Sequence, residues 1–220
     1  MTILDALEIE DREVGKIYGV AAGVVTNNQD EKKLGRVKLK FPWLSDDNET
    51  DWVRIVTFMS GSEFGGFFLP EVGDEVLVAF EQGDINHPYV IGALWNDTAA
   101  PPEKNEDGNN NFRLIKSRSG HIIKLDDTDG NEKIEIVDKS ENNRLIIDTS
   151  SNKISIISDM DIEISAPSGK ISIAAKEIEI SASGGKASIF GNEMEIKSNT
   201  TSKIEASADM TLKGAMVNIN

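Results

Sequence analysis

The feature that most constrains the fold is a short repeat in the second half of the chain. Two apolar residues separated by one other residue recur from Ile134 to Ile219, and successive pairs begin six to eleven residues apart. Such alternation is typical of a β-strand, and the residues between pairs are mostly the Ser, Ala, Asn, Gly and Lys of turns. The eleven pairs are Ile134/Ile136, Leu145/Ile147, Ile154/Ile156, Ile162/Ile164, Ile171/Ile173, Ile178/Ile180, Ala187/Ile189, Met194/Ile196, Ile204/Ala206, Met210/Leu212 and Val217/Ile219.

One apolar pair per strand is too small a face to exclude water, so these strands must stack or intertwine to share a core. The units are also too short to form a three-sided coil from one chain, so we expect three chains to supply the three walls of a shaft. After residue 112 the only aromatic residue is Phe190, which suits a narrow shaft. The expected trimer core comprises Ile134, Ile136, Ile154, Ile156, Ile162, Ile164, Ile171, Ile173, Ile178, Ile180, Ile189, Met194 and Ile196.

The first half has a different core, since all three Trp, both Tyr and six of eight Phe precede residue 112. Five β-rich runs separated by turn residues predict a five-stranded Greek-key barrel of the OB type over residues 15–96, because closure removes exposed strand edges. The runs are Tyr18–Thr26, Gly35–Phe41, Trp52–Phe58, Glu75–Phe80 and Tyr89–Leu94. Residues 1–14 are compatible with a short acidic helix, residues 97–111 read as a linker, and residues 112–220 hold the repeats. The predicted fold class is therefore all-β.

The amino-acid composition argues against several classes of function. With 23 basic and 38 acidic residues the formal charge is −15, which disfavours binding to nucleic acid or to an anionic membrane surface. The absence of cysteine excludes disulfides, thiolate nucleophiles and cysteine zinc sites. The start of the chain lacks the basic and apolar regions of a secretory signal, so we expect assembly in the cytoplasm. We predict no catalytic residue, metal or cofactor, and hence no enzyme.

Three sites with possible chemistry favour a structural interpretation. His87 and His121 each lie alone in a turn or at a strand start, without partners for a catalytic triad. The acidic residues 126–132 suggest calcium, but the spacing does not fit an EF-hand loop. Asp129-Gly130, between two apolar pairs, instead predicts a hairpin with a type I′ turn.

Four stretches together resemble a known family, and they cover most of residues 15–220 with the repeats that follow them. The stretches are GRVKLKFPW (35–43), DWVRIV (51–56), PEVGDEVLVAFEQGDINHPYVIGALWN (70–96) and SRSGHIIKLDDTDGNEKIEI (117–136). They resemble the central spike proteins of contractile injection systems, namely the phage baseplate assembly protein V family and the matching part of the type VI secretion VgrG spikes. The resemblance implies an OB-fold domain seated on a baseplate hub, followed by an intertwined homotrimeric β-helix, or β-prism, that sheath contraction drives through the target envelope.

The resemblance also implies partners. Because about 14 residues precede the barrel, we expect the hub to be a separate chain, and Pro42, Trp43, Trp52, Gly73, Asp74 and Pro88 are its candidate contacts. The chain has neither the lysozyme-like insert nor the terminal His-x-His motif of some spikes, so we expect a separate PAAR-type tip protein to dock on Met216, Val217 and Ile219. Contact with the target membrane is expected only on firing. A β-solenoid acting as an adhesive or carbohydrate-binding module stays open as the alternative.

Overall fold

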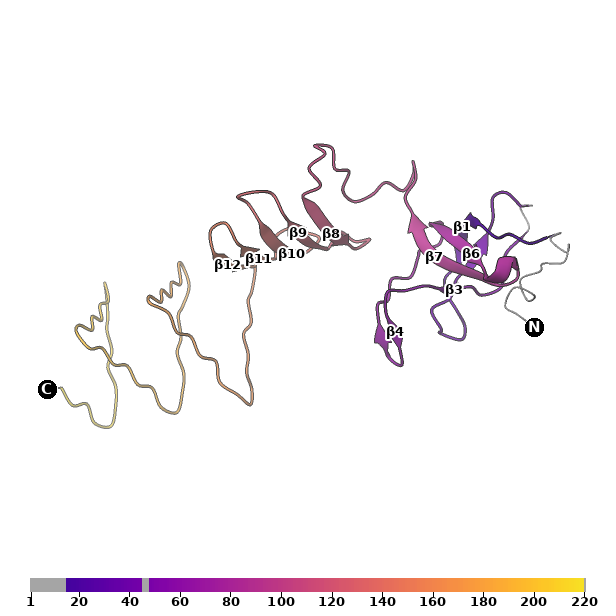
Figure 1. Cartoon of the computed structure of the whole chain (residues 1–220). Helices are drawn as coiled ribbons and strands as arrows, with labels where there is room; N and C mark the ends of the chain where they lie inside the picture. Colours follow the sequence, from indigo (N-terminus) through magenta and orange to yellow (C-terminus); the bar gives the residue numbers. More distant parts are fainter. Residues whose placement is uncertain (1–14, 45–47, 220) are drawn as a thin grey trace, which may run out of the picture. The chain divides into compact units, whose positions relative to one another are not determined.

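The computed structural model describes residues 15–44 and 48–219, and the regular elements of this part are twelve β-strands and one short 3-10 turn, all before residue 158 (Figure 1). Chain contacts divide it into two units, Met1–Ile162 and Glu163–Asn220. The helix expected within residues 1–14 lies outside the described residues. The predicted linker, residues 97–111, contains no strand, and the predicted domain boundaries stay a prediction.

The first half of the first unit is a five-stranded barrel. Its sheet order is β2-β1-β6-β7-β3, with β3 parallel to β7 and the other neighbours antiparallel. Val37 and Val53 close the barrel between β2 and β3, since the N–H of each donates to the carbonyl of the other at 3.0 and 2.7 Å. This order is that of an OB fold, as the sequence predicted. The strands are β1 (Val20–Asn27), β2 (Lys38–Lys40), β3 (Arg54–Ile55), β6 (Glu75–Phe80) and β7 (Pro88–Leu94).

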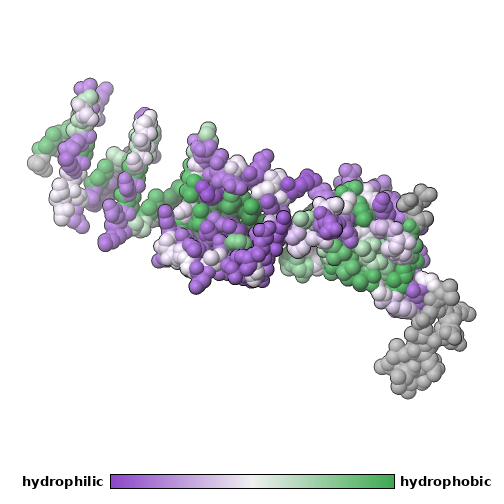
Figure 2. All heavy atoms as spheres, turned by 90° about the horizontal axis from the view of Figure 1, so that it is seen from above, coloured by the Kyte–Doolittle hydropathy of each residue, from purple (hydrophilic) through white to green (hydrophobic). Residues whose placement is uncertain are grey.

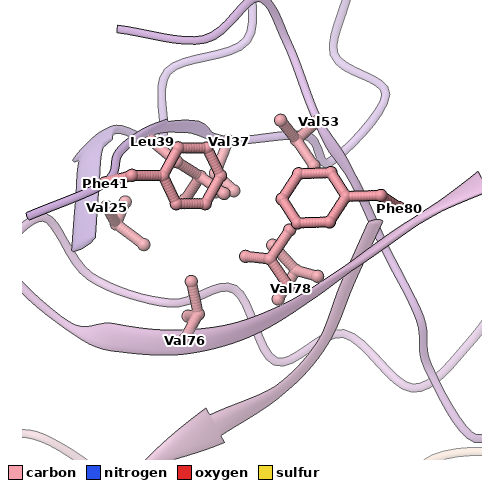
Figure 3. Packing of buried hydrophobic residues seen from close by; sticks show 9 residues of the cluster. Val25, Val37, Leu39, Phe41, Val53, Val76, Val78 and Phe80 are labelled. Atoms are coloured by element: carbon pink, nitrogen blue, oxygen red, sulfur yellow. The ribbon is translucent and has the colours of Figure 1, made fainter. Parts of the chain in front are cut away.

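The barrel core consists of Val, Leu and Phe side chains from the strands and the residues next to them (Figure 3). In β6 the buried residues are Val76, Val78 and Phe80, every second position, as a strand with one face inward requires. The rings of Phe41 and Phe80 meet at a centroid distance of 5.8 Å across the interior. The buried residues are Val25, Val37, Leu39, Phe41, Val53, Val76, Val78, Phe80 and Val90.

The barrel carries one element that the sequence reading did not predict. Residues 58–68 form a small hairpin of β4 (Ser60–Gly61) and β5 (Phe64–Gly65) between β3 and β6, and Figure 1 shows it projecting from the barrel. A short 3-10 turn, Glu81–Gly83, then connects β6 to β7.

A second sheet follows, in which five consecutive strands pair antiparallel in chain order (Figure 1). Its strands are β8 (Phe112–Lys116), β9 (Ile122–Asp126), β10 (Lys133–Val137), β11 (Arg144–Asp148) and β12 (Lys153–Ile157). The last three contain the first three apolar pairs of the repeat. The first repeats are therefore separate short strands joined by turns, as predicted.

One turn differs from the prediction. The β9–β10 hairpin exists, but its pairing stops at Asp126 and Lys133, and residues 127–132 form the loop. The N–H of Asn131 donates to the carbonyl of Thr128 at 2.8 Å, with Asp129-Gly130 between them. Only Gly130 has a positive φ, of 73°, whereas a type I′ turn needs positive φ at both central residues. The predicted turn type is therefore wrong.

The second unit contains the remaining repeats. Within the described residues 163–219 no strand is present, and one backbone hydrogen bond occurs, from the Gly169 N–H to the Ala166 carbonyl at 3.2 Å. The chain is thus extended without backbone partners of its own, although its sequence alternates as strands do. Figure 1 draws it as a plain trace.

Candidate assembly surfaces

The sheet of β8–β12 has one apolar face that stays exposed to solvent among the described residues. Register places Ile134 beside Leu125 and Ile147, and Ile136 beside Ile123 and Leu145. Neighbouring residues across a sheet share a face, so the pairs form one continuous apolar surface. It comprises Ile115, Ile123, Leu125, Ile134, Ile136, Leu145, Ile147, Ile154 and Ile156. All but Leu145 are exposed large hydrophobic residues.

The opposite face carries charged side chains that pair within the sheet. Glu135, on β10 between Ile134 and Ile136, is 8% exposed and contacts Lys124 at 2.6 Å and Lys133 at 3.6 Å. Asp126, also buried, accepts a hydrogen bond from the Thr128 N–H at 3.0 Å. The opposite face thus combines these paired charged residues with apolar ones, among them Ile146 and Ile157, while Arg113 lies beside Leu125 at the β8 edge of the apolar face.

The second unit also exposes its apolar residues, although it contains no sheet. The expected core residues from Ile162 to Ile196 are all exposed in the single chain, and Figure 2 shows hydrophobic and hydrophilic atoms along the same winding trace. Met216, Val217 and Ile219, the expected tip contacts, are exposed as well. Because the upstream pairs are equally uncovered, exposure alone does not set these three residues apart.

The expected hub contacts lie in two regions of the barrel. The Gly73 N–H donates to the Val25 carbonyl at 2.9 Å, and the Val25 N–H donates to the Asp74 carbonyl at 3.0 Å, which fixes both residues at the start of β6. Pro88 pairs with Phe80 at the other end of β6, about 20 Å away at about 3.3 Å per residue. The structure therefore does not bring Gly73 and Asp74 together with Pro88.

Trp52 is placed near the Pro88 end, and Pro42 and Trp43 follow the end of β2. Trp52 precedes β3, whose Arg54 pairs with Tyr89, the neighbour of Pro88. Trp52 is partly buried, and the charged groups of Arg36 and Lys38 lie 5.9 and 5.7 Å from its ring centroid. Pro42 and Trp43 are exposed after β2, and the Trp43 ring lies 5.5 Å from that of Phe41. Trp43 is therefore free to bind a partner on one side, while Phe41 supports it on the other.

The carboxylates of Asp30 and Asp148 accept hydrogen bonds within turns of the chain. Asp30 accepts hydrogen bonds from the N–H groups of Lys32 and Leu34 and from the guanidinium of Arg36, and this guanidinium holds the pKa of Asp30 far below its usual range. The Ser151 N–H and the Ser150 hydroxyl lower the pKa of Asp148 to about 2.

The histidines have similarly local partners. Nδ1 of His87 contacts Asp84 at 3.0 Å, and the N–H of Asn86 and this ring lower the pKa of Asp84. Nδ1 of His121 accepts a hydrogen bond from the Lys139 N–H at 3.2 Å. In residues 15–44 and 48–219 no three His, Asp or Glu side chains are grouped to hold a metal ion, and no helix there is long and apolar enough to span a membrane.

Sequence reasoning missed the projecting hairpin as a surface. Four Phe lie within residues 58–68, interspersed with Gly61, Gly65 and Gly66. All four are exposed. The signal that could have found the surface is this density of aromatic residues among glycines.

Comparison with known proteins agrees with this architecture. Residues 21–95 match the family described as the type VI secretion system/phage-baseplate injector OB domain. The chain is 31% identical over 123 residues to the type VI secretion system spike protein VgrG5 of Pseudomonas aeruginosa, which covers 52% of this chain and 14% of VgrG5. It is 31% identical over 134 residues to VgrG4b of the same species, an alignment that covers 54% of this chain and 16% of VgrG4b. It is 37% identical over 73 residues to VgrG3 of Vibrio cholerae, which covers 31% of this chain and 7% of VgrG3.

These matches cover at most about a sixth of each relative, so the chain corresponds to a part of those proteins. The two longer alignments, over 123 and 134 residues, are longer than the matched injector OB domain of residues 21–95. Residues 21–95 therefore match an injector OB domain, and the chain is similar to spike proteins of the VgrG type.

Proposed function

We propose that this chain is the membrane-puncturing central spike of a contractile injection system, a homotrimer seated on a separate hub and driven by sheath contraction. The observation that supports the proposal best is the uncovered apolar face of β8–β12. A face of nine apolar residues in water is unstable unless another surface covers it. Two further copies of the same face supply that cover in a three-walled shaft.

The second unit supports the same assembly. Residues 163–219 have strand-like alternation but one backbone hydrogen bond among themselves. Buried backbone groups need partners, so strands of neighbouring copies would pair with this segment. An intertwined shaft of about twelve strands per chain, at about 4.7 Å per strand, would be about 55 Å long. Such a shaft resists bending and unfolds slowly, as transmission of force to a membrane requires.

The barrel is the proposed attachment to the hub. Residues 15–96 contain 12 acidic and seven basic residues, so a hub surface with basic patches would attract them, and added salt would weaken the attachment. Trp43 and Pro42, exposed together, are the proposed central contacts. The spike would assemble in the cytoplasm, and it has no proposed enzymatic or nucleic-acid-binding role.

The tip is the proposed site of a PAAR-type partner. Met216, Val217 and Ile219 would form an apolar platform on the threefold axis, and a conical protein would cover it. Deletion of residues 215–220 should abolish recruitment of the tip protein and leave the trimer intact, because the upstream repeats supply the shared core. Undiminished recruitment by the shortened protein would exclude this docking site.

Sedimentation equilibrium of the purified chain tests the central proposal. Three chains of 24.0 kDa give a species of about 72 kDa, and electron microscopy should show a thin rod attached to a wider base. A 24 kDa species would contradict the spike and favour a monomeric β-solenoid that binds a surface. A dimer would mean that two sheets, rather than three, cover each other.

A further inference from the structure

The hairpin of β4 and β5 and the loop between β1 and β2 enclose an apolar groove. The groove has a volume of about 700 Å³, within the range of about 300–1,000 Å³ that is typical of small-molecule sites. One wall is the hairpin, and the other is the loop at Leu34 and Gly35. We call this space the hairpin groove; its exposed apolar lining consists of Leu34, Val56, Met59 and the four phenylalanines of residues 58–68.

The hairpin wall is held in place by contacts of its own. A Cβ on Gly61 would collide with the Phe64 ring, and a Cβ on Gly66 would collide with the Phe58 ring. Each ring thus packs on bare backbone and turns its other side to solvent. The Thr57 hydroxyl donates to the Gly66 carbonyl at 2.8 Å at the base of the hairpin. A wall that is ordered before binding loses little conformational entropy when a ligand binds.

The loop wall is fixed by Asp30. Its carboxylate accepts hydrogen bonds from the N–H groups of Lys32 and Leu34, both at 3.0 Å, and from the Arg36 guanidinium at 2.8 Å. The N–H of Lys33 donates to the Asp30 carbonyl at 2.9 Å. These bonds set the course of the loop, and Lys33 and Leu34 are the residues that it places in the lining of the hairpin groove.

The hairpin groove offers few hydrogen bonds to an occupant. The Gly66 N–H donates to the Met59 carbonyl at 3.0 Å, and β4 and β5 pair with each other. In the described part of the chain no buried side-chain nitrogen or oxygen lacks a partner. A peptide in the groove would need partners for its own buried N–H and C=O groups, whereas an acyl chain has none to satisfy. The lining therefore favours an acyl chain over a peptide.

The charged residues of the lining give the site a direction. Among the described residues that line the hairpin groove, Lys33 is the one base and Glu63 the one acid, and they lie on opposite walls. The barrel as a whole is acidic, but residues 30–36 contain three bases and two acids, and Asp30 is paired with Arg36. A ligand with one anionic end would therefore be attracted at Lys33 and repelled at Glu63.

We propose that the hairpin groove binds a single acyl chain with an anionic end. The carboxylate or phosphate lies at the Lys33 ammonium, and the hydrocarbon lies along the phenylalanine rings of the hairpin. Free fatty acids and anionic membrane lipids share this chemistry. The site is formed within one chain, so the inference does not rest on the proposed shaft. It would give the barrel a lipid ligand that the net charge of the whole chain does not suggest.

Isothermal titration calorimetry of the purified full-length chain tests the site. The ligands are laurate and dodecylamine, which have chains of the same length and opposite charge, each below the concentration at which it forms micelles. We expect one laurate per chain, bound at least about fivefold more tightly than dodecylamine, since one ion pair at a protein surface contributes up to about 1 kcal/mol. Lys33→Glu should weaken laurate binding at least about fivefold. Lys32→Glu, the matched control outside the lining, should change it much less.

A second variant carries Phe58→Ser and Phe64→Ser, and it should lose the binding of both ligands. Phe190→Ser removes an exposed ring from the second unit and should leave binding unchanged. Circular dichroism checks that the double variant folds; if it does not, the comparison of Lys33→Glu with Lys32→Glu decides. Flotation with phosphatidylglycerol vesicles separates the two sources. Flotation of the wild type but not of the double variant would identify a membrane lipid, and laurate binding without flotation a free fatty acid.

Four results would overturn the proposal. They are the absence of saturable laurate binding, equal affinities for laurate and dodecylamine, equal effects of Lys33→Glu and Lys32→Glu, and undiminished binding by a folded double variant. Laurate binding that Ile154→Asp abolishes and the double variant retains would assign the ligand to the apolar face of β8–β12, and would likewise exclude the hairpin groove.

Discussion

Ile154→Asp and Ser155→Asp are adjacent substitutions that add the same charge to opposite faces of β12. Ile154 lies on the apolar face beside Ile147, and Ser155 pairs with Ile146 on the other face. In the single chain Ile154 is 68% exposed. An aspartate there would disturb the isolated sheet little, so a large effect of Ile154→Asp must come from another copy that covers the face.

The magnitude follows from the exposed fraction. Full burial of an Ile side chain contributes about 1.5–3 kcal/mol, and about two thirds of this remains to be gained by Ile154 on assembly. The substitution forfeits that gain in each of three copies, about 3–6 kcal/mol per trimer. It also buries three unpaired carboxylates, each at a cost of several kcal/mol. The total exceeds about 10 kcal/mol, comparable with the whole stability of a typical domain.

Analytical ultracentrifugation and thermal unfolding measure the outcome. Ile154→Asp should sediment as a monomer, or as a trimer that melts far below the wild type. Ser155→Asp should stay trimeric and melt within a few degrees of it. Indistinguishable trimers with equal melting temperatures would refute the reasoning, since they would show that no chain covers the β8–β12 face.

Three further predictions concern the turns and the charge. Asp30→Asn should lower the melting temperature of the barrel, because the charged carboxylate joins two backbone N–H groups to the Arg36 guanidinium in one loop. Asp148 has a lowered pKa of about 2, so its stabilising contribution is present above about pH 4 and lost as the pH falls toward 2. Asp148→Asn should remove this contribution at neutral pH and flatten the acid dependence of the melting temperature, with the hydrogen bond from the Ser151 N–H weakened. Single-stranded DNA at low salt should not bind residues 15–96 of the full chain, as fluorescence anisotropy would show.

Matched controls separate these effects from general changes of charge. Glu31→Gln removes a neighbouring exposed carboxylate and should leave the melting temperature nearly unchanged. Asp129→Asn, the control for Asp148→Asn, removes an exposed carboxylate in the β9–β10 loop and should likewise leave the melting temperature nearly unchanged. If Asp30→Asn and Glu31→Gln lowered the melting temperature equally, the role given to Asp30 in its loop would be wrong. If the melting temperatures of Asp148→Asn and the wild type depended equally on pH, the role given to the Asp148 carboxylate would be wrong. Binding of single-stranded DNA with micromolar affinity would contradict the argument that the acidic barrel repels nucleic acid.

Strand positions were predictable where one side of the strand enters a core. Glu75–Phe80 was predicted as a strand with the bounds that the structure has, because Val76, Val78 and Phe80 alternate with half-buried residues. The run from Trp52 to Phe58 was predicted too long, since only Arg54–Ile55 pairs with β7. After it the chain turns away into the projecting hairpin. Alternation shows that a strand is possible, and partners elsewhere in the chain decide where it ends.

The candidate surfaces were predictable only in part. The apolar pairs identified the residues of the uncovered face, since Ile134 and Ile136 follow the period of a strand. The register that joins them to Ile123 and Leu125 of β9 is a tertiary property of the hairpin. The packing of Phe58 and Phe64 on glycines was hidden for the same reason: it depends on which residues the turn places opposite each other.

The contrast between the two parts of the repeat suggests an order of assembly. Strands β8–β12 satisfy their backbone hydrogen bonds within one chain through neighbours close in sequence, and such local pairing forms quickly. Residues 163–219 have almost no backbone partners of their own, so in the proposed trimer their pairing would wait until other copies are adjacent. Three preformed sheets that meet through their apolar faces would align the three chains. Pairing of the remaining repeats would then proceed from the sheet toward the C-terminal end.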